Sequence, residues 1–100
     1  MEIDRELVEK IEEVAPKLKA CGHHLRLKIL CAIESRDVCV TDLWECFGQS
    51  QPVVSQHLAV LKRKGIVKAA VQGNKRIYTI VDPFIEKLVR DLIKKGHKES

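Results

Sequence analysis

Apolar residues recur every three or four positions in three stretches of the chain, which is the spacing of one face of an α-helix. We expect helices over about residues 3–20, over about residues 24–34, and from Asp82-Pro83 to about residue 95. Pro16 is expected to kink or restart the first helix. The apolar positions of the first and last helices are Ile3, Leu7, Ile11, Val14 and Leu18, and Phe84, Ile85, Leu88, Val89, Leu92 and Ile93.

Two shorter helices are predicted in the middle of the chain. The first begins near Thr41, whose hydroxyl can cap it, and ends at Gly48. The second covers about residues 51–64 and follows Ser50, a second capping residue. Its buried stripe consists of Val54, Leu58 and Leu61. Because only a short turn separates the two helices, the pattern predicts a helix-turn-helix over about residues 41–64.

The hydrophobic period changes after this helix-turn-helix. Two β-prone runs, at about residues 66–71 and 77–81, flank Gln72-Gly73-Asn74-Lys75, a sequence typical of a hairpin turn. The hairpin forms a wing over about residues 66–81. We therefore predict that residues 1–100 form a single winged helix-turn-helix domain, mostly α with a β-hairpin wing. The expected order is helix, helix, helix, helix, strand, strand, helix.

Positive charge is concentrated in the same middle region. The chain has 100 residues and a net charge of +4. Residues 46–81 contain no Asp or Glu, whereas residues 1–20 are net negative. The basic residues of the middle region are Lys62, Arg63, Lys64, Lys68, Lys75 and Arg76. A basic stretch between more acidic ones predicts binding to nucleic acid.

Several other classes of protein are disfavoured by the sequence. No apolar run approaches the roughly 20 residues that span a bilayer, and the acidic N-terminal pattern is not that of a signal peptide. We therefore expect a cytoplasmic protein with no membrane partner. No nucleophile elbow, phosphate-binding loop, HExxH or CxxC is present, so we predict no enzymatic activity. The cysteines are expected to be free thiols rather than disulfides.

The start of the helix over residues 51–64 is expected to read double-stranded operator DNA, because such a helix places its N-terminal residues at base edges in the major groove. Glutamine can bond adenine, serine can bond a base or a phosphate, and valine can pack on a thymine methyl group. The residues predicted to make these contacts are Ser50, Gln51, Val53, Ser55, Gln56 and His57. Phosphate contacts, which give affinity rather than sequence choice, are predicted for Lys62, Arg63, Lys75 and Arg76.

A homodimer is expected, because one such domain reads only one half-site. The apolar stripes of the first and last helices are too large for so small a core. We expect these two helices, at about residues 3–20 and 83–95, to pack across a two-fold axis.

The segments LKACGHHLRLKILCAI and SQPVVSQHLAVLKRKGIV, followed by the GNKRIYTI hairpin, resemble the ArsR/SmtB family of winged-helix repressors. The resemblance covers about residues 18–81. It implies a homodimeric, sequence-specific repressor of its own operon that leaves DNA when an effector binds. Effectors in that family include arsenite, transition metals and oxidised or persulfide sulfur species. The resemblance therefore implies release by a metal or metalloid ion or by reversible cysteine oxidation.

The family's effector sites are incomplete in this chain. The thiolate site of the arsenic sensors has three cysteines, and the corresponding segment Cys39-Val40-Thr41-Asp42-Leu43-Trp44 keeps only Cys39. The family's metal site on the last helix keeps Asp82, but its other places are occupied by Phe84, Lys95 and Lys98. A zinc site needs about four donors, so no metal site is assigned.

The cysteines leave several alternatives open. Cys31 matches the cysteine of the family's persulfide and dithiol-switch branch, but the second cysteine of that pair is absent from the last helix. Cys31 would therefore need Cys21, Cys39 or a partner subunit, and our hypothesis joins Cys31 to Cys39. These thiols could instead be buried small hydrophobes, or Cys21 could bind a metal with His23 and His24. A cysteine-based metal-binding or scaffold module without DNA function is the alternative to a repressor.

Overall fold

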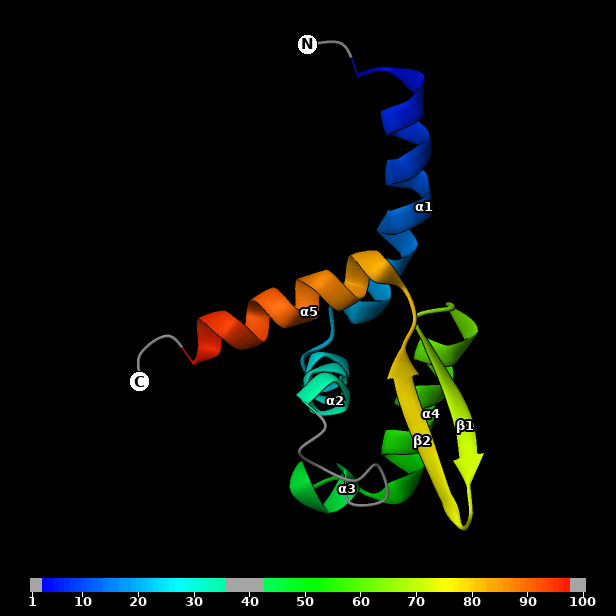
Figure 1. Ribbon diagram of the computed structural model, residues 1–100, viewed down its shortest axis with the longest axis vertical. Helices are drawn as coiled ribbons and strands as arrows, with labels where there is room; N and C mark the ends of the chain where they lie inside the picture. Colours follow the sequence, from blue (N-terminus) through cyan, green and yellow to red (C-terminus); the bar gives the residue numbers. More distant parts are fainter. Residues whose placement is uncertain (1–2, 36–42, 98–100) are drawn as a thin grey trace.

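The computed structural model describes residues 3–35 and 43–97. Its elements confirm the predicted order (Figure 1). They are α1 (Arg5–Cys21), α2 (His24–Ser35), α3 (Leu43–Cys46), α4 (Gln51–Arg63), β1 (Val67–Gln72), β2 (Lys75–Ile80) and α5 (Pro83–Gly96). The predicted capping residue Thr41 and the candidate thiol Cys39 lie outside the described residues.

Helix α2 lies at the centre of the molecule, where α1, α4, α5 and β2 all contact it. The core is formed by the apolar stripes predicted for α2, α4 and α5. Its largest fully buried side chains are Ile29, Leu30, Leu43, Val54, Leu61, Ile66, Ile85 and Val89. The core therefore fixes α4 along one face and leaves its opposite face to solvent.

Helix α1 packs against the body only near its C-terminal end and projects away from it (Figure 1). Its buried residues are Ala20 and Cys21. The helix runs through Pro16 without interruption, so the restart considered at this position is not observed. Proline removes the hydrogen bond to the carbonyl of Glu12, but this residue is exposed and water can take the vacant place.

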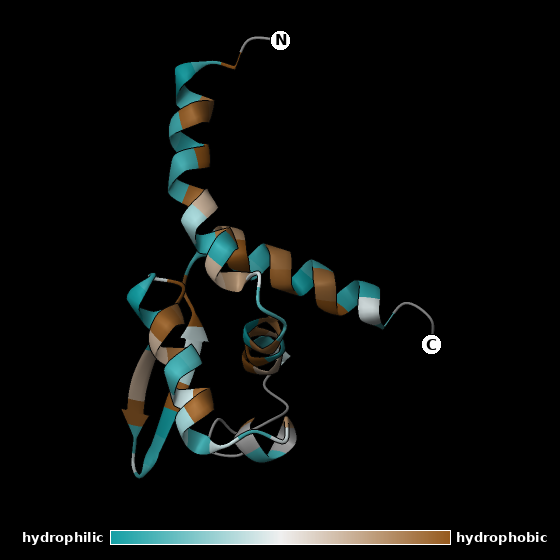
Figure 2. Cartoon of the chain, turned by 180° about the vertical axis from the view of Figure 1, so that it is seen from behind, coloured by the Kyte–Doolittle hydropathy of each residue, from teal (hydrophilic) through white to brown (hydrophobic). Residues whose placement is uncertain are grey.

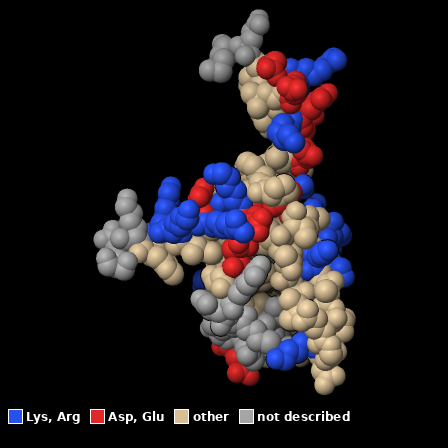
Figure 3. Space-filling model, viewed as in Figure 1, with Lys and Arg blue, Asp and Glu red and all other residues tan. Residues whose placement is uncertain are grey.

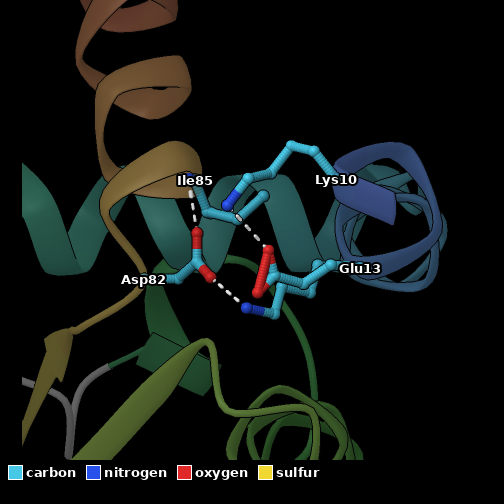
Figure 4. A network of polar contacts seen from close by, with 5 residues as sticks. Lys10, Glu13, Asp82 and Ile85 are labelled. Carbon is cyan, nitrogen blue, oxygen red and sulfur yellow. Dashed lines mark hydrogen bonds and ion pairs between the residues drawn. The ribbon is translucent and has the colours of Figure 1, made fainter. Parts of the chain in front are cut away.

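Asp82 joins α5 to α1 (Figure 4). Its carboxylate caps α5 by accepting the backbone N–H of Ile85 at 2.9 Å, and it forms an ion pair with Lys17 of α1. Burial alone would raise the pKa of Asp82, but the hydrogen bonds from Lys17 and Ile85 outweigh burial and lower it. The residue that matches a metal ligand of the family thus serves here as a helix cap and an ion-pair partner.

A tight turn joins α3 to α4. Gly48 has a φ of 65°, in the left-handed region that glycine adopts at little cost. The hydroxyl of Ser50 then caps α4 by accepting the backbone N–H of Val53 at 3.4 Å. Two helices joined by a short turn, α3 and α4, are thus observed within the segment where the sequence predicts a helix-turn-helix.

The hairpin pairs β1 with β2 in antiparallel register, from Val67↔Ile80 to Gln72↔Lys75. Gly73 and Asn74 therefore form a two-residue turn, with a φ of 62° at Gly73. Because the turn is this short, β2 begins at Lys75 rather than at about residue 77. Lys75 and Arg76 are strand residues beside the turn.

Candidate nucleic-acid interface

The start of α4 and the tip of the hairpin lie at the same end of the molecule (Figure 1). We call this end the reading face and define it as residues 50–56 with residues 72–76. Helix α4 begins here, directly after α3, and the antiparallel strands meet here at their turn. In a winged helix this arrangement lets the helix enter the major groove while the hairpin reaches the neighbouring backbone.

Uncharged polar side chains cover the start of α4. Ser50, Gln51, Ser55 and Gln56 are all exposed, as predicted. The Ser50 hydroxyl already accepts a hydrogen bond from Val53, but its own proton can still be donated to a phosphate. Val53 is half-buried and packs against the core, so less of it is available to a base than expected.

The two cations of the hairpin tip are both exposed. Lys75 lies opposite Gln72 and Arg76 lies opposite Val71. Because successive side chains of a strand point to opposite faces, these two cations lie on opposite faces of the hairpin. They can therefore contact phosphates on either side of it.

Lys62 and Arg63 lie at the other end of α4. Helix α4 has 13 residues, and its rise separates Gln51 from Arg63 by about 18 Å. Arg63 and Lys64 line an open groove of about 800 Å³ together with residues of α1 and α2, and we call it the α1–α4 groove. Contact of Lys62 and Arg63 with DNA stays a prediction, and the two residues lie away from the reading face.

His57, which the sequence predicts to contact DNA, is half-buried. Arg26 of α2 donates from Nε to Nδ1 of His57 at 3.0 Å, and the ring of His23 lies 4.7 Å from that of His57. The contact joins residues 31 positions apart, which no local sequence pattern encodes. Burial lowers the pKa of His57, and the nearby His23, Arg26 and His24 lower it further.

The two described cysteines with assigned burial lie in different environments. Cys21 is buried in the core, whereas Cys31 is half-buried and lines a cavity of about 580 Å³ between α2, α5 and Phe47. Burial raises the pKa of both thiols. Among the described residues, no three His, Cys, Asp or Glu side chains are placed to hold a metal, so Cys21, His23 and His24 do not form the metal cluster considered above.

Helices α1 and α5 both expose apolar side chains, and Figure 2 shows these as brown bands along the two helices. On α1 they are Leu7, Val8, Ile11 and Leu18, with Ile3 just before the helix, and on α5 they are Phe84, Leu88 and Leu92. The two sets meet at an apolar cavity of about 280 Å³, where Phe84 lies beside Leu7, Ile11 and Leu18. The core of a single chain leaves this surface uncovered.

Charge is distributed unevenly over the surface. Figure 3 shows acidic side chains along α1, and basic ones along α5 and over the side of α4 and the hairpin. Within the described part of the chain, none of the helices combines the length and the hydropathy that crossing a membrane requires.

Comparison with known proteins identifies close relatives. The family model described as "bacterial regulatory protein, arsR family" matches residues 23–69. An HTH-type transcriptional regulator of Methanocaldococcus jannaschii is 37% identical over 84 residues, which is 83% of this chain and 94% of the relative. The biofilm growth-associated repressor of Xylella fastidiosa is 34% identical over 88% of this chain and 78% of its own length. The structure of reduced HlyU from Vibrio cholerae matches 94% of this chain and 98% of its own with a TM-score of 0.80 and 26% identity.

Proposed function

The chain belongs to the ArsR family of bacterial regulatory proteins, and from this membership we propose that it represses transcription as a homodimer whose two reading faces bind two half-sites of one operator. Members of the family are DNA-binding transcriptional regulators rather than enzymes. The observation that supports our proposal best is the reading face itself. It combines exposed, uncharged hydrogen-bonding side chains on α4 with a basic hairpin tip.

We assign sequence choice to α4. Gln51 and Gln56 are exposed in its first turns and can each bridge an adenine edge. Ser50 and Ser55 are suited to a phosphate or a base, and the exposed part of Val53 to a thymine methyl group. His57 is held by Arg26, so its role in our proposal is to fix α4 in place rather than to read a base.

We assign affinity and register to the hairpin. Lys75 and Arg76 would contact phosphates flanking the major groove, and such contacts do not depend on sequence. Lys62 and Arg63 would contribute to the positive field of the domain from the far end of α4.

The dimer would form through α1 and α5. Their exposed apolar side chains give each chain a surface that a second copy can cover across a two-fold axis. The two recognition helices of such a dimer must lie about 34 Å apart to reach successive major grooves. A small rotation between the subunits would therefore release the DNA.

Cys31 is the thiol that we propose as the effector site. It lies in α2 beside the cavity that Leu92 and Ile93 of α5 also line. Oxidation of this thiol, or its binding of a soft metal or metalloid ion, would alter the packing of α2 against a helix of the dimer interface. Cys39, its proposed partner, lies outside the described residues, and the buried Cys21 is the less accessible alternative.

The proposal can be tested by selecting duplexes that bind the protein from a pool of random sequences. We expect an enriched motif with two half-sites one helical turn apart. Leu92→Glu should give a monomer in analytical ultracentrifugation and lose affinity for the selected duplex, whereas the matched control Lys94→Glu, on the same helix, should remain a dimer. A pool without an enriched motif would contradict sequence-specific binding, and a dimeric Leu92→Glu would place the interface elsewhere.

A further inference from the structure

The α1–α4 groove is a hollow that the proposed DNA contacts and dimer do not explain. It has a volume of about 800 Å³ and lies between α1, the start of α2 and the end of α4. Its cations are Lys19, Arg26, Arg63 and Lys64, and its carboxylate is Glu12. Apolar surface between them comes from Ala15, Pro16, Ala20 and Val60.

We infer that this groove binds a small organic anion, with a phosphate or carboxylate group on an apolar body. The excess of cations attracts a negative group, because a cleft lined mainly by one sign of charge concentrates its field there. The apolar residues can bury the uncharged part of the same molecule. Inorganic phosphate carries only the first of these two features and should bind more weakly.

Arg26 is the residue best prepared to hold the anionic group. Two hydrogen bonds fix its guanidinium plane, one from Nε to Nδ1 of His57 at 3.0 Å and one from Nη1 to the carbonyl of Ala20 at 3.1 Å. Nη2 has no hydrogen-bond partner within the described part of the chain. A planar guanidinium held in this way loses little freedom when it binds a carboxylate or phosphate.

The groove lies to one side of the apolar stripe of α1 and away from the reading face. At 3.6 residues per turn, Glu12, Pro16 and Lys19, which line it, face roughly 100° or more away from the stripe of Leu7, Ile11 and Leu18. The end of α4 is also about 18 Å from Gln51 along the helix. Ala15 lines both the groove and the apolar cavity of α1 and α5, so the groove borders the proposed dimer surface, while its cations lie outside that surface.

Arg26 links the groove to the middle of the recognition helix, because it lines the groove and also donates a hydrogen bond to His57. Arg26 bonds a ligand on one side and His57 of α4 on the other. The groups facing His57 are Arg26, His23 and His24, all of them neutral or cationic. A bound anion would offset the charge of Arg26, so the imidazole of His57 should take up a proton at a higher pH.

The test is a titration of ¹⁵N-labelled protein with phenyl phosphate and with benzoate, followed by amide chemical shifts, and a separate titration with a random-sequence duplex. We expect both anions to shift amides near Lys19, Arg26 and Lys64. Benzyl alcohol and inorganic phosphate should bind at the same place with at least tenfold lower affinity. Arg63→Gln with Lys64→Gln should weaken binding of phenyl phosphate about tenfold or more. The matched control Lys94→Gln with Lys95→Gln removes the same charge outside the groove and should bind normally.

Three results would overturn the inference. Equal loss in the groove variant and the control would mean that the anion responds only to net charge. Inorganic phosphate binding as tightly as phenyl phosphate would remove the role of the apolar walls. A random-sequence duplex that shifts the groove amides when phenyl phosphate does not would make the groove a DNA contact.

An NMR titration of His57 should show the higher pKa with phenyl phosphate bound, and an unchanged pKa would break the link to α4. Because the assay contains no operator, its outcome is independent of sequence-specific repression.

Discussion

The two ends of α4 have the same local structure but opposite environments. At its start, Ser50, Gln51 and Gln56 are exposed. At its end, Leu61 is fully buried and Arg63 faces the α1–α4 groove. One face of the helix, from Val54 to Leu61, is thus fixed by the core, and His57 accepts a hydrogen bond from α2.

The comparison shows how a small domain can present polar side chains with a defined geometry. A helix of 13 residues gains little stability from its own hydrogen bonds, and tertiary packing must hold it. The buried side chains of Val54, Leu58 and Leu61 supply that packing along one face of α4, so the exposed positions of its first turns are free of that constraint. The basic residues in the middle of the sequence accordingly divide between two surfaces. Lys75 and Arg76 lie at the hairpin tip, and Arg63 and Lys64 line the α1–α4 groove.

The largest effect should come from removing the packing at the fixed end. Leu61→Ala deletes a fully buried side chain and should lower the free energy of unfolding by about 2–5 kcal/mol. Val53→Ala removes a half-buried side chain near the start of the helix and should lower the free energy of unfolding clearly less. Urea denaturation at one protein concentration measures both, and equal losses would mean that the two halves of α4 are equally packed.

A substitution at the reading end should act on DNA rather than on stability. Gln56→Ala removes an exposed side chain and should cost about 1–3 kcal/mol on a selected duplex, with little loss on random DNA. Fluorescence anisotropy with the two duplexes measures the difference. Similar losses of affinity for both duplexes would mean that Gln56 contacts the DNA backbone rather than a base.

Breaking the link between α2 and α4 should have an intermediate effect. Arg26→Gln removes the hydrogen bonds to His57 and Ala20 and should cost roughly 0.5–1.5 kcal/mol for each bond lost. It also removes a cation from beside His57, so the pKa of His57 should rise in the variant. An NMR titration of the imidazole checks this directly, and an unchanged pKa would show that Arg26 does not act on His57.

The same group gives the protein a pH dependence of defined sign. The pKa of His57 is lower in the folded chain than in the unfolded one. Its contribution to stability is therefore present above the unfolded pKa of about 6.5 and is lost as the pH falls through the folded pKa. Denaturation curves between pH 7.5 and 5 should show a smaller loss in Arg26→Gln than in the parent.

The smallest effect should separate the two basic surfaces. Lys75→Ala should weaken binding to every duplex and reduce the slope of log K against log salt by about 0.9, the value for one phosphate contact. Lys62→Ala, at the far end of α4, should change the slope less. A larger change of slope for Lys62→Ala than for Lys75→Ala would assign the phosphate contacts to the end of α4 rather than to the hairpin.

Much of this architecture follows from the sequence alone. The period of apolar residues, the cap at Ser50, the Asp82-Pro83 start of the last helix and the Gly73-Asn74 turn are local signals, and each predicts its element correctly. The exposed residues at the start of α4 also follow from the helical period. Long-range contacts do not, because the period alone assigns no partner to the polar side of a helix. The hydrogen bond between Arg26 and His57 therefore appears only in the structure, as does the separation of Arg63 from Lys75.

The most direct test of the account is a map of amide chemical-shift changes when a selected duplex is added to the protein. We predict the largest changes over residues 50–56 and 72–76, the two segments of the reading face, with smaller changes over residues 60–64. A map with its maximum over residues 60–64 and no change at the hairpin tip would contradict the account.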